Sequence, residues 1–322
     1  MKLPLTELEQ AATQALLRLG YNRQEAATMQ AVLLYAQVRG SSRGIAELFL
    51  SGSAKKASKT RLEIQKETPA TAFIHAHSAH AMLAVSKASD IAIEKARQCG
   101  IAVIAVHHTS AASGALGYYP YKIASAGLVG IVMATTPPMV APAGSYKRIL
   151  GANPLAVAIP TAAEPLVLDM DTAVLAFPSV QSLVNAQKPL PEQAAYDKNG
   201  YPTTDPLSAL QGAMRPFGGY KGSHLSVIIQ LLAGPLAGSD GTADNVRGHL
   251  VLAINPEILG GTNALKAQTT TLLTRIKKTK KLPGTPEILL PGEIEEGKRQ
   301  AVLTSGKVEI DKKLYKKLLD LR

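Results

Sequence analysis

The first part of the chain has apolar residues at helical spacing. One side of the first predicted helix carries Leu8, Ala12, Leu16 and Leu17. Thr6 and Glu9 have the spacing of a capping box, and Gly20 is typical of a helix end. We therefore predict an amphipathic helix that Thr6 caps and Gly20 ends.

A second helix is predicted from Asn22 to about Arg39. Asn22 and Glu25 form another capping-box pattern, ahead of apolar residues that repeat every three or four positions. The segment Gly40–Gly44 breaks this helix, and Ile45–Leu50 restarts one. The N-terminal part is thus predicted to be a small helical unit.

From about residue 70 the pattern changes to alternating strands and helices. Continuous apolar runs predict strands over Thr71–His75, Ile101–Val106, Leu128–Ala134, Ala156–Pro160 and Gly248–Asn255. Helical spacing predicts helices over Ala79–Cys99, Tyr118–Ala126 and Ser223–Leu236. A polar loop with the turn Asp197–Gly200 separates the later elements. The fold class is therefore α/β.

Composition narrows the surroundings in which this fold works. No run of about 18 apolar residues occurs, so we expect no membrane span. The start of the chain lacks the apolar stretch of a signal peptide, and Cys99 has no second cysteine to pair with. Both features favour a cytoplasmic protein.

The net charge of +11 raises the question of nucleic-acid binding. Much of the excess lies near the C-terminus, and the chain has no Trp and only 4 Phe to stack on bases. We therefore expect a solvated basic helix face and regard nucleic acid as an improbable partner. A basic molecule also attracts an anionic cofactor or substrate.

The two common phosphate-binding loops are absent. No GxGxxG follows a strand, and no GxxxxGK[ST] occurs. The motif PFGGYKG, Pro216–Gly222, has suitable chemistry, because its glycines permit close approach to an anion and Lys221 adds charge ahead of a helix. The alternative is a glycine-rich turn with a surface lysine.

Five of the seven histidines occur in two groups. His75, His77 and His80 cross a strand-to-helix junction without a nearby cysteine or acid, so we predict no metal site. His107 and His108 end the Ile101–Val106 strand, where α/β proteins collect polar site residues. One of this pair is a candidate to contact substrate or cofactor; packing at the strand end is the alternative.

Two further pairs are candidates for site chemistry. Ser42 and Arg43 lie in the glycine-flanked break, where they can present a hydroxyl and a guanidinium to a site. The alternative is that Ser41 or Ser42 simply caps the next helix. Asp169 and Asp171 are two apart after an apolar strand and so share a side. That arrangement suits acid–base or metal chemistry, or simply the capping of a loop.

Four motifs in order, SGALGYYPYKIASAGLVGIVMA, LGANPLAVAIP, LDMDTA and PFGGYKG, resemble the malate/L-lactate dehydrogenase family. The resemblance implies an α/β fold that is not a Rossmann fold, with an N-terminal helical unit. It also implies hydride transfer from NADPH or NADH to a C=O or cyclic C=N beside a carboxylate, and a homodimer.

The resemblance suggests a division of the chain and a set of cofactor contacts. Residues 1–69 form the helical unit, which we expect to pack with C-terminal helices of residues 264–322. Residues 70–263 form the domain that binds cofactor and substrate. The implied cofactor contacts are Ser113, Gly114, Ala115, Leu116, Met170, Asp171, Thr172, Lys221 and Gly222.

The catalytic half of the pattern is altered. The family motif Ser-His-Gly-x-x-Arg reads Ser42-Arg43-Gly44 and then Glu47, so arginine replaces the proton-donating histidine and glutamate replaces the carboxylate-binding arginine. Ser42, Arg43 and a displaced His108 are the implied catalytic residues. Glu47 and Ala152, the latter in place of the threonine of GTNP, stand at the substrate positions.

Two functions are compatible with this mixture. A reductase fits the retained cofactor motifs. Its small-molecule substrate should differ from the family's usual 2-oxo acids, because Glu47 should repel a 2-oxo acid. A degenerate family member that binds a ligand or partner fits the altered catalytic positions. We favour the reductase.

Overall fold

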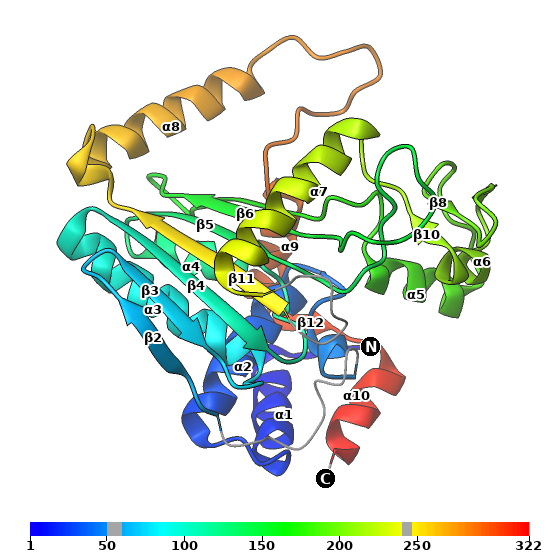
Figure 1. Cartoon of the computed structure of the whole chain (residues 1–322), viewed down its shortest axis with the longest axis horizontal. Helices are drawn as coiled ribbons and strands as arrows, with labels where there is room; N and C mark the ends of the chain where they lie inside the picture. The colour runs from blue at the N-terminus through cyan, green and yellow to red at the C-terminus, as the bar shows by residue number, and fades with distance from the viewer. Residues whose placement is uncertain (50–59, 240–246, 322) are drawn as a thin grey trace.

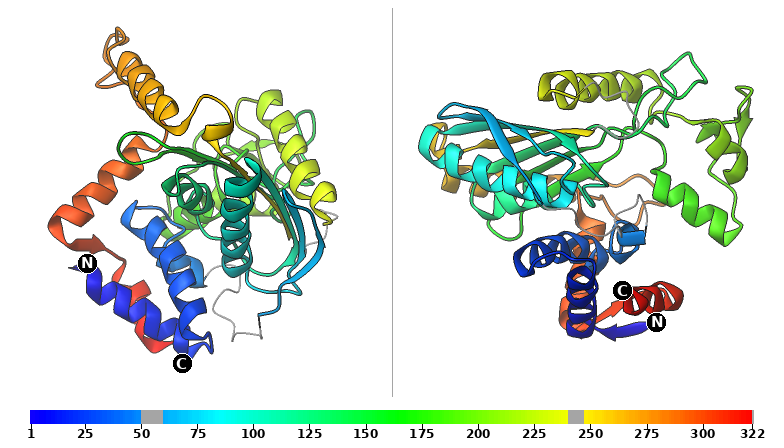
Figure 2. Two further views of the ribbon diagram at one scale, coloured as in Figure 1. Left: turned by 90° about the vertical axis from the view of Figure 1, so that its left-hand side faces the viewer. Right: turned by 60° about the horizontal axis from the view of Figure 1, so that its bottom comes forward.

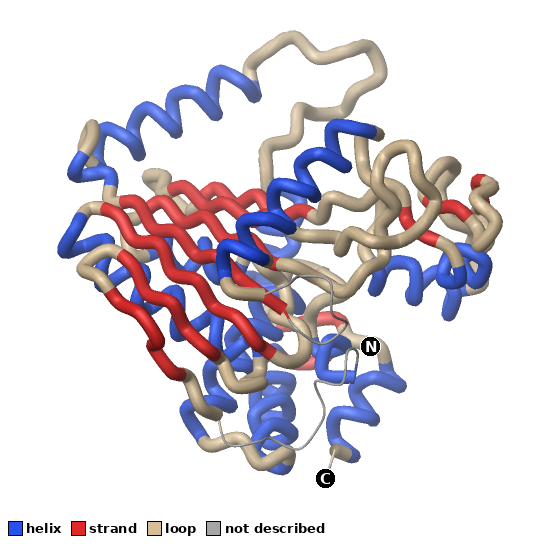
Figure 3. The backbone as a smooth tube through the Cα atoms, viewed as in Figure 1, coloured by secondary structure: helices blue, strands red, loops and turns tan. Residues whose placement is uncertain are grey.

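The computed structural model describes residues 1–49, 60–239 and 247–321. Its centre is a sheet with the strand order β2-β3-β4-β11-β5-β6-β7 (Figures 1 and 3). The strands are β2 (Glu63–Glu67), β3 (Thr71–His75), β4 (Ile101–Thr109), β5 (Val129–Ala134), β6 (Leu155–Ile159), β7 (Leu166–Met170) and β11 (Arg247–Ile254). Within this sheet β3 and β4 pair in parallel, and the other neighbouring pairs are antiparallel.

Helices cover the two faces of the sheet unequally. One face packs against α3 (Ala81–Cys99) and α4 (Tyr118–Ser125), and the other against α7 (Tyr220–Ala233) (Figure 2). Outside α3 and α4 lie α1 (Leu5–Arg18) and α2 (Arg23–Val38). The large core therefore lies on the side of α3, where it spans the sheet and the N-terminal helices.

The C-terminal part returns to the start of the chain. The strand β12 (Lys307–Glu309) pairs with β1 (Lys2–Pro4), and α9 (Glu293–Ser305) and α10 (Lys312–Asp320) lie beside the N-terminal helices. In contrast, α8 (Thr262–Lys277) extends away from them and has no buried residue (Figure 1).

A small lobe lies beyond the end of the large sheet. It holds α5 (Phe177–Ala186), α6 (Pro206–Gln211) and the sheet β10-β8-β9, formed by Ala213–Met214, Ala195–Tyr196 and Pro202–Thr203. Short 3-10 helices complete the chain: η1 (Ile45–Phe49), η2 (Pro235–Ala237) and η3 (Pro256–Ile258). A second apolar cluster fills this lobe.

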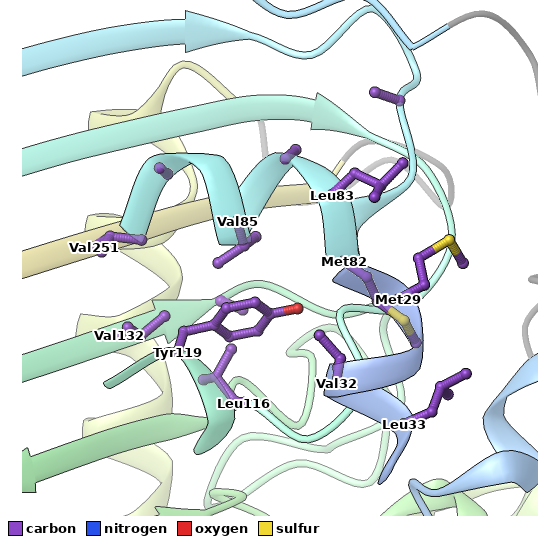
Figure 4. Packing of buried hydrophobic residues seen from close by; sticks show 14 of the residues in the cluster. Met29, Val32, Leu33, Met82, Leu83, Val85, Leu116, Tyr119, Val132 and Val251 are labelled. Carbon is purple, nitrogen blue, oxygen red and sulfur yellow. The ribbon is translucent and has the colours of Figure 1, made fainter. Parts of the chain in front are cut away.

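Packing against α2 and α3 fixes the loop before α4. Gly114 has φ +72°, and a Cβ there would lie 2.7 Å from Cγ1 of Val32 and 3.2 Å from Cε of Met82. Tyr119 is fully buried beside these residues, and its hydroxyl donates to the Ser113 carbonyl (Figure 4). The conformation of this loop therefore depends on the N-terminal helices.

The structure confirms the α/β fold and the five predicted strands to within a few residues. The first capping box is wrong: residues 2–4 pair as β1, so the helix begins at Leu5 and Thr6 falls inside its first turn. Sequence analysis missed β2, a polar edge strand. Leu50 lies outside the described residues. No described helix is long and apolar enough to cross a membrane.

The two capping boxes make a matched test. Asn22 accepts from the Glu25 amide (2.9 Å), and the Glu25 carboxylate accepts from the Asn22 amide (3.0 Å). Asn22→Ala should lower the free energy of unfolding by about 1 kcal/mol, as expected for a lost N-cap. Thr6→Ala is the control and should change it little, because Thr6 makes no cap. Denaturant unfolding measures both; equal losses would contradict the assignment.

Candidate functional site

Three of the sequence motifs meet at Thr172. Its amide and its hydroxyl both donate to the Ala152 carbonyl (2.8 and 2.7 Å). Its own carbonyl accepts from the Phe217 amide (3.0 Å), and Ala173 bridges to Pro216. Thr172 is fully buried. It therefore joins LGANP, LDMDTA and PFGGYKG to one another and has no surface of its own facing a ligand.

A cavity of about 480 Å³ lies beside this junction, within the range that holds small ligands. The described residues around it come from the Gly40–Gly44 break, the loop before α4, the end of β5, β7, β11 and the small lobe. Of the residues predicted from sequence, it is lined by Ser42, Arg43, Ser113, Gly114, Ala115, Leu116, Ala152, Met170 and Asp171. The structure thus brings together residues predicted for both cofactor and substrate.

Lys221 and Gly222 are not among the described residues that line the cavity. Lys221 is exposed in the first turn of α7, after Gly218 and Gly219 with φ +58° and +63°. Gly222 is buried, and a Cβ there would lie 2.1 Å from the Phe217 carbonyl oxygen. Gly222 therefore has a packing role, and cofactor contact by Lys221 stays a prediction.

The Gly40–Gly44 break contributes to the cavity and also makes a local turn contact. The Ser41 hydroxyl accepts from the Arg43 amide (3.2 Å). Ser41, Ser42 and Arg43 all line the cavity. The prediction that Ser42 and Arg43 lie at a site is therefore compatible with the structure.

Glu47 lies behind the cavity wall. It has no exposed surface, and its Oε2 is 3.6 Å from Nη1 of Arg43, an ion pair without a hydrogen bond. Burial raises the pKa of Glu47, and the charges of Arg43 and Arg247 oppose that shift. Glu47 is not among the described residues that line the cavity. The expectation that Glu47 repels a carboxylate stays a prediction.

Arg247 and His249 are cavity residues that sequence analysis missed. They are two apart on β11 and face the same side. The Nη1 atom of Arg247 and Nδ1 of His249 are buried with no hydrogen-bond partner among the described residues. Burial lowers the pKa of His249 to about 3, so its ring is neutral. The alternation Arg-Gly-His at the start of the predicted strand was the available signal.

Asp169 and Asp171 both line the cavity. The Oδ2 atom of Asp169 also accepts from the Gly117 amide at the start of α4 (2.8 Å), so this carboxylate has a capping role as well. Its side chain is accessible through the cavity although it lies deep in the protein, and desolvation raises its pKa to about 6. Desolvation also raises the pKa of Asp171, opposed by Arg43.

His108 is not among the described residues that line the cavity. Its backbone has φ +56°, and its Nδ1 is 2.7 Å from Nδ1 of His107. The side chain therefore points to a group of histidines at the ends of β3 and β4. The structure gives no support for a catalytic His108 in the cavity, because the left-handed turn directs it elsewhere.

Comparison with known proteins agrees with the fold. The family model described as malate/L-lactate dehydrogenase matches residues 3–319. The malate/(S)-sulfolactate dehydrogenase of Methanothermus fervidus is 33% identical over 94% of this chain and 92% of its own. The Δ1-pyrroline-2-carboxylate reductase of Pseudomonas fluorescens is 38% identical over 60% of this chain and 61% of the reductase. The structure of sulfolactate dehydrogenase from Methanocaldococcus jannaschii superposes with a TM-score of 0.89 at 32% identity, covering 100% of this chain and 96% of that one.

Proposed function

Because the chain belongs to the malate/L-lactate dehydrogenase family of NAD(P)-dependent oxidoreductases, we propose that it reduces a C=O or cyclic C=N group in a small carboxylate. The observation that carries this proposal is the cationic wall of the cavity. Arg43, Arg148 and Arg247 all line it. We further propose a cytoplasmic location, which suits the single cysteine, Cys99.

Arg247 is the group best placed to bind a substrate carboxylate. A buried guanidinium nitrogen without a partner is costly, and an anion in the cavity would satisfy it. Arg43, from the Gly40–Gly44 break, supplies a second positive charge. Its ion pair with Glu47 reduces the net charge of these two residues. The named relatives act on malate, sulfolactate and pyrroline-2-carboxylate, which all carry a carboxylate.

The residues around the cavity also fit a nicotinamide cofactor. The loop Ser113–Leu116 offers backbone to a ligand, and Gly114 holds it in a left-handed conformation that a side chain would disturb. Met170 and Asp171 line the same cavity. NADPH or NADH, when bound, supplies the hydride. Lys221 stays our proposal for an additional phosphate contact outside the cavity.

Asp169 is our candidate for the proton donor. Arginine is a poor general acid near neutral pH, so Arg43 cannot replace the family's histidine in that role. Asp169 opens onto the cavity, and its raised pKa of about 6 keeps part of the population protonated under mildly acidic conditions. Ser42 and Arg43 would then bind and orient the reacting group.

Replacement of Arg247 tests the carboxylate site. Arg247→Met should raise KM for a 2-oxo acid or imine carboxylate about 10- to 100-fold, because a charge-assisted hydrogen bond is lost. The dissociation constant for NADPH should stay the same. Arg97→Met, which removes an exposed guanidinium elsewhere, is the control.

An unchanged KM for Arg247→Met would contradict the carboxylate site alone. A protein that binds neither NADPH nor NADH and reduces no member of a panel of 2-oxo acids and cyclic imines would contradict the oxidoreductase proposal itself. That result would favour the alternative, in which the protein is a catalytically inactive family member that binds a ligand or partner.

The pH dependence of kcat tests Asp169. If it donates the proton in reduction, kcat should be high while the carboxyl is protonated and fall as pH rises through about 6. Asp169→Asn keeps an acceptor for the Gly117 amide but has no proton to donate, so kcat should fall about 10²- to 10⁴-fold and lose that pH dependence. A variant with the same pH profile as the wild type would exclude this role.

We also propose a homodimer. Around the buried Met133 and Leu250, the sheet face under α7 has further apolar residues that are only partly buried. The helix α7 itself exposes Ile228 (52%) and Leu231 (51%). The neighbouring α8 has no buried residue and exposes Leu272 (55%). A second copy of the chain laid over this face would bury these surfaces and cover the projecting helix.

Charge on α7 should separate the subunits. The double variant Ile228→Glu, Leu231→Glu should run as a monomer in sedimentation analysis, because it places carboxylates in an apolar interface. Leu207→Glu, on an exposed position of α6 in the small lobe, is the control and should leave the dimer intact. A wild-type monomer at all concentrations would contradict the proposal.

A further inference from the structure

Four histidine rings lie together outside the cavity. We call His75, His77, His107 and His108 the histidine cluster. The His75 ring centroid is 4.0 Å from that of His77, 4.7 Å from His107 and 4.5 Å from His108. None of the four is among the described residues that line the cavity. The cluster is thus a separate chemical centre.

Strand pairing builds this cluster. β3 and β4 run in parallel with His75 opposite His107, which places the two rings side by side. On its other edge β4 has one residue more than β11 between two pairs, Val106 with His249 and Thr109 with Arg247. This bulge contains His108 with φ +56° and brings its ring to that of His107.

Hydrogen bonds set the protonation of the rings. The Gln65 side-chain oxygen lies 3.2 Å from Nε2 of His107. In the tautomer in which Nε2 donates to this oxygen, Nδ1 carries a lone pair. That lone pair faces Nδ1 of His108 at 2.7 Å.

The polar neighbours resemble the outer shell of a metal site. A metal-bound histidine usually donates its second N–H to a carbonyl or carboxylate, which fixes its tautomer. The side-chain oxygen of Gln65 lies in the corresponding place beside His107. For His77 this place is taken by Oε2 of Glu63, which lies 2.8 Å from Nε2 of His77 and 2.8 Å from Nη2 of Arg61. Left-handed φ values at His77 and His108 are a further sign of a constrained site.

We propose that His75, His107 and His108 bind a divalent transition-metal ion of the zinc type. One nitrogen from each ring lies within 4.8 Å of the others, and neutral imidazoles suit such ions. The His77 amide donates to Nδ1 of His75 (3.0 Å). If His75 binds the ion, its Nδ1 either contacts the metal or carries the ring proton, and in both cases it no longer accepts from the His77 amide. A small movement at His77 therefore accompanies binding.

This proposal departs from the expectation that the chain has no metal site. The sequence pattern grouped His75 with His77 and His80. In the structure His80 instead caps α3, where its Nδ1 accepts from the Met82 amide (3.2 Å). The missing ligands are His107 and His108, more than thirty residues along the chain.

The test uses the full chain, purified without a histidine tag and stripped of metal by a chelator. Calorimetry with Zn²⁺ should show one ion per chain, and Co²⁺ should give an absorption spectrum typical of bound nitrogen ligands. His107→Gln and His75→Gln should each weaken Zn²⁺ binding at least about tenfold, and Gln65→Leu about tenfold through loss of the outer contact. His224→Gln removes an exposed histidine on α7 and should bind as the wild type does.

Thermal unfolding separates lost ligands from lost structure. Zn²⁺ should raise the Tm of the wild type and of His224→Gln, and leave that of a folded His107→Gln unchanged. If His107→Gln does not fold, the same measurement is made on His75→Gln, which changes a more exposed residue. Its Tm should likewise not rise with Zn²⁺. A wild type that binds no Zn²⁺ or Co²⁺ would overturn the proposal. Binding that is lost in His224→Gln and kept in His75→Gln and Gln65→Leu would do the same.

Discussion

The bulge at the end of β4 sets the geometry on both sides of that strand. Pairing with β11 is regular as far as Val106 and His249, and resumes with Thr109 and Arg247 after one extra residue on β4. In a regular strand His107 and His108 would point to opposite faces of the sheet. Because His108 is left-handed, the two rings meet, and the Thr109 hydroxyl donates to the Arg247 carbonyl (3.3 Å). One irregularity thus forms the histidine cluster and fixes the start of β11 beside the cavity.

Charge balance explains why the altered catalytic motif is compatible with a working site. A carboxylate as deeply buried as Glu47 requires a compensating charge, which Arg43 and Arg247 supply. Arg43 stands where the family has histidine, and Glu47 stands where it has arginine, so the two differences form one coupled change. The positive charge that can meet a substrate is then carried by Arg247.

Sequence reasoning succeeded where local patterns carry the information. The loop Ser113–Leu116 and the segment Met170–Asp171, which their motifs assign to one site, do line one cavity, and their contact with a cofactor stays a prediction. It failed where the site depends on pairing between distant strands. Arg247 reaches the cavity because β11 lies between β4 and β5, and the pattern of the chain does not give that order. The capping box at Thr6 failed for a similar reason, since pairing of the chain ends determines where α1 begins.

The separation of two ligand centres follows from the charges around them. The cavity is lined by Arg43, Arg148 and Arg247 as well as by Asp169 and Asp171. Within it, the guanidinium nitrogen of Arg247 that has no partner among the described residues attracts an anionic substrate. Beside the histidine cluster, the charged groups Glu63 and Arg61 compensate each other. Salt screens charges beyond roughly 8–10 Å, so each centre responds mainly to its own neighbours. A cation at the end of β4 and an anionic substrate beside the start of β11 can therefore bind without competing for one site.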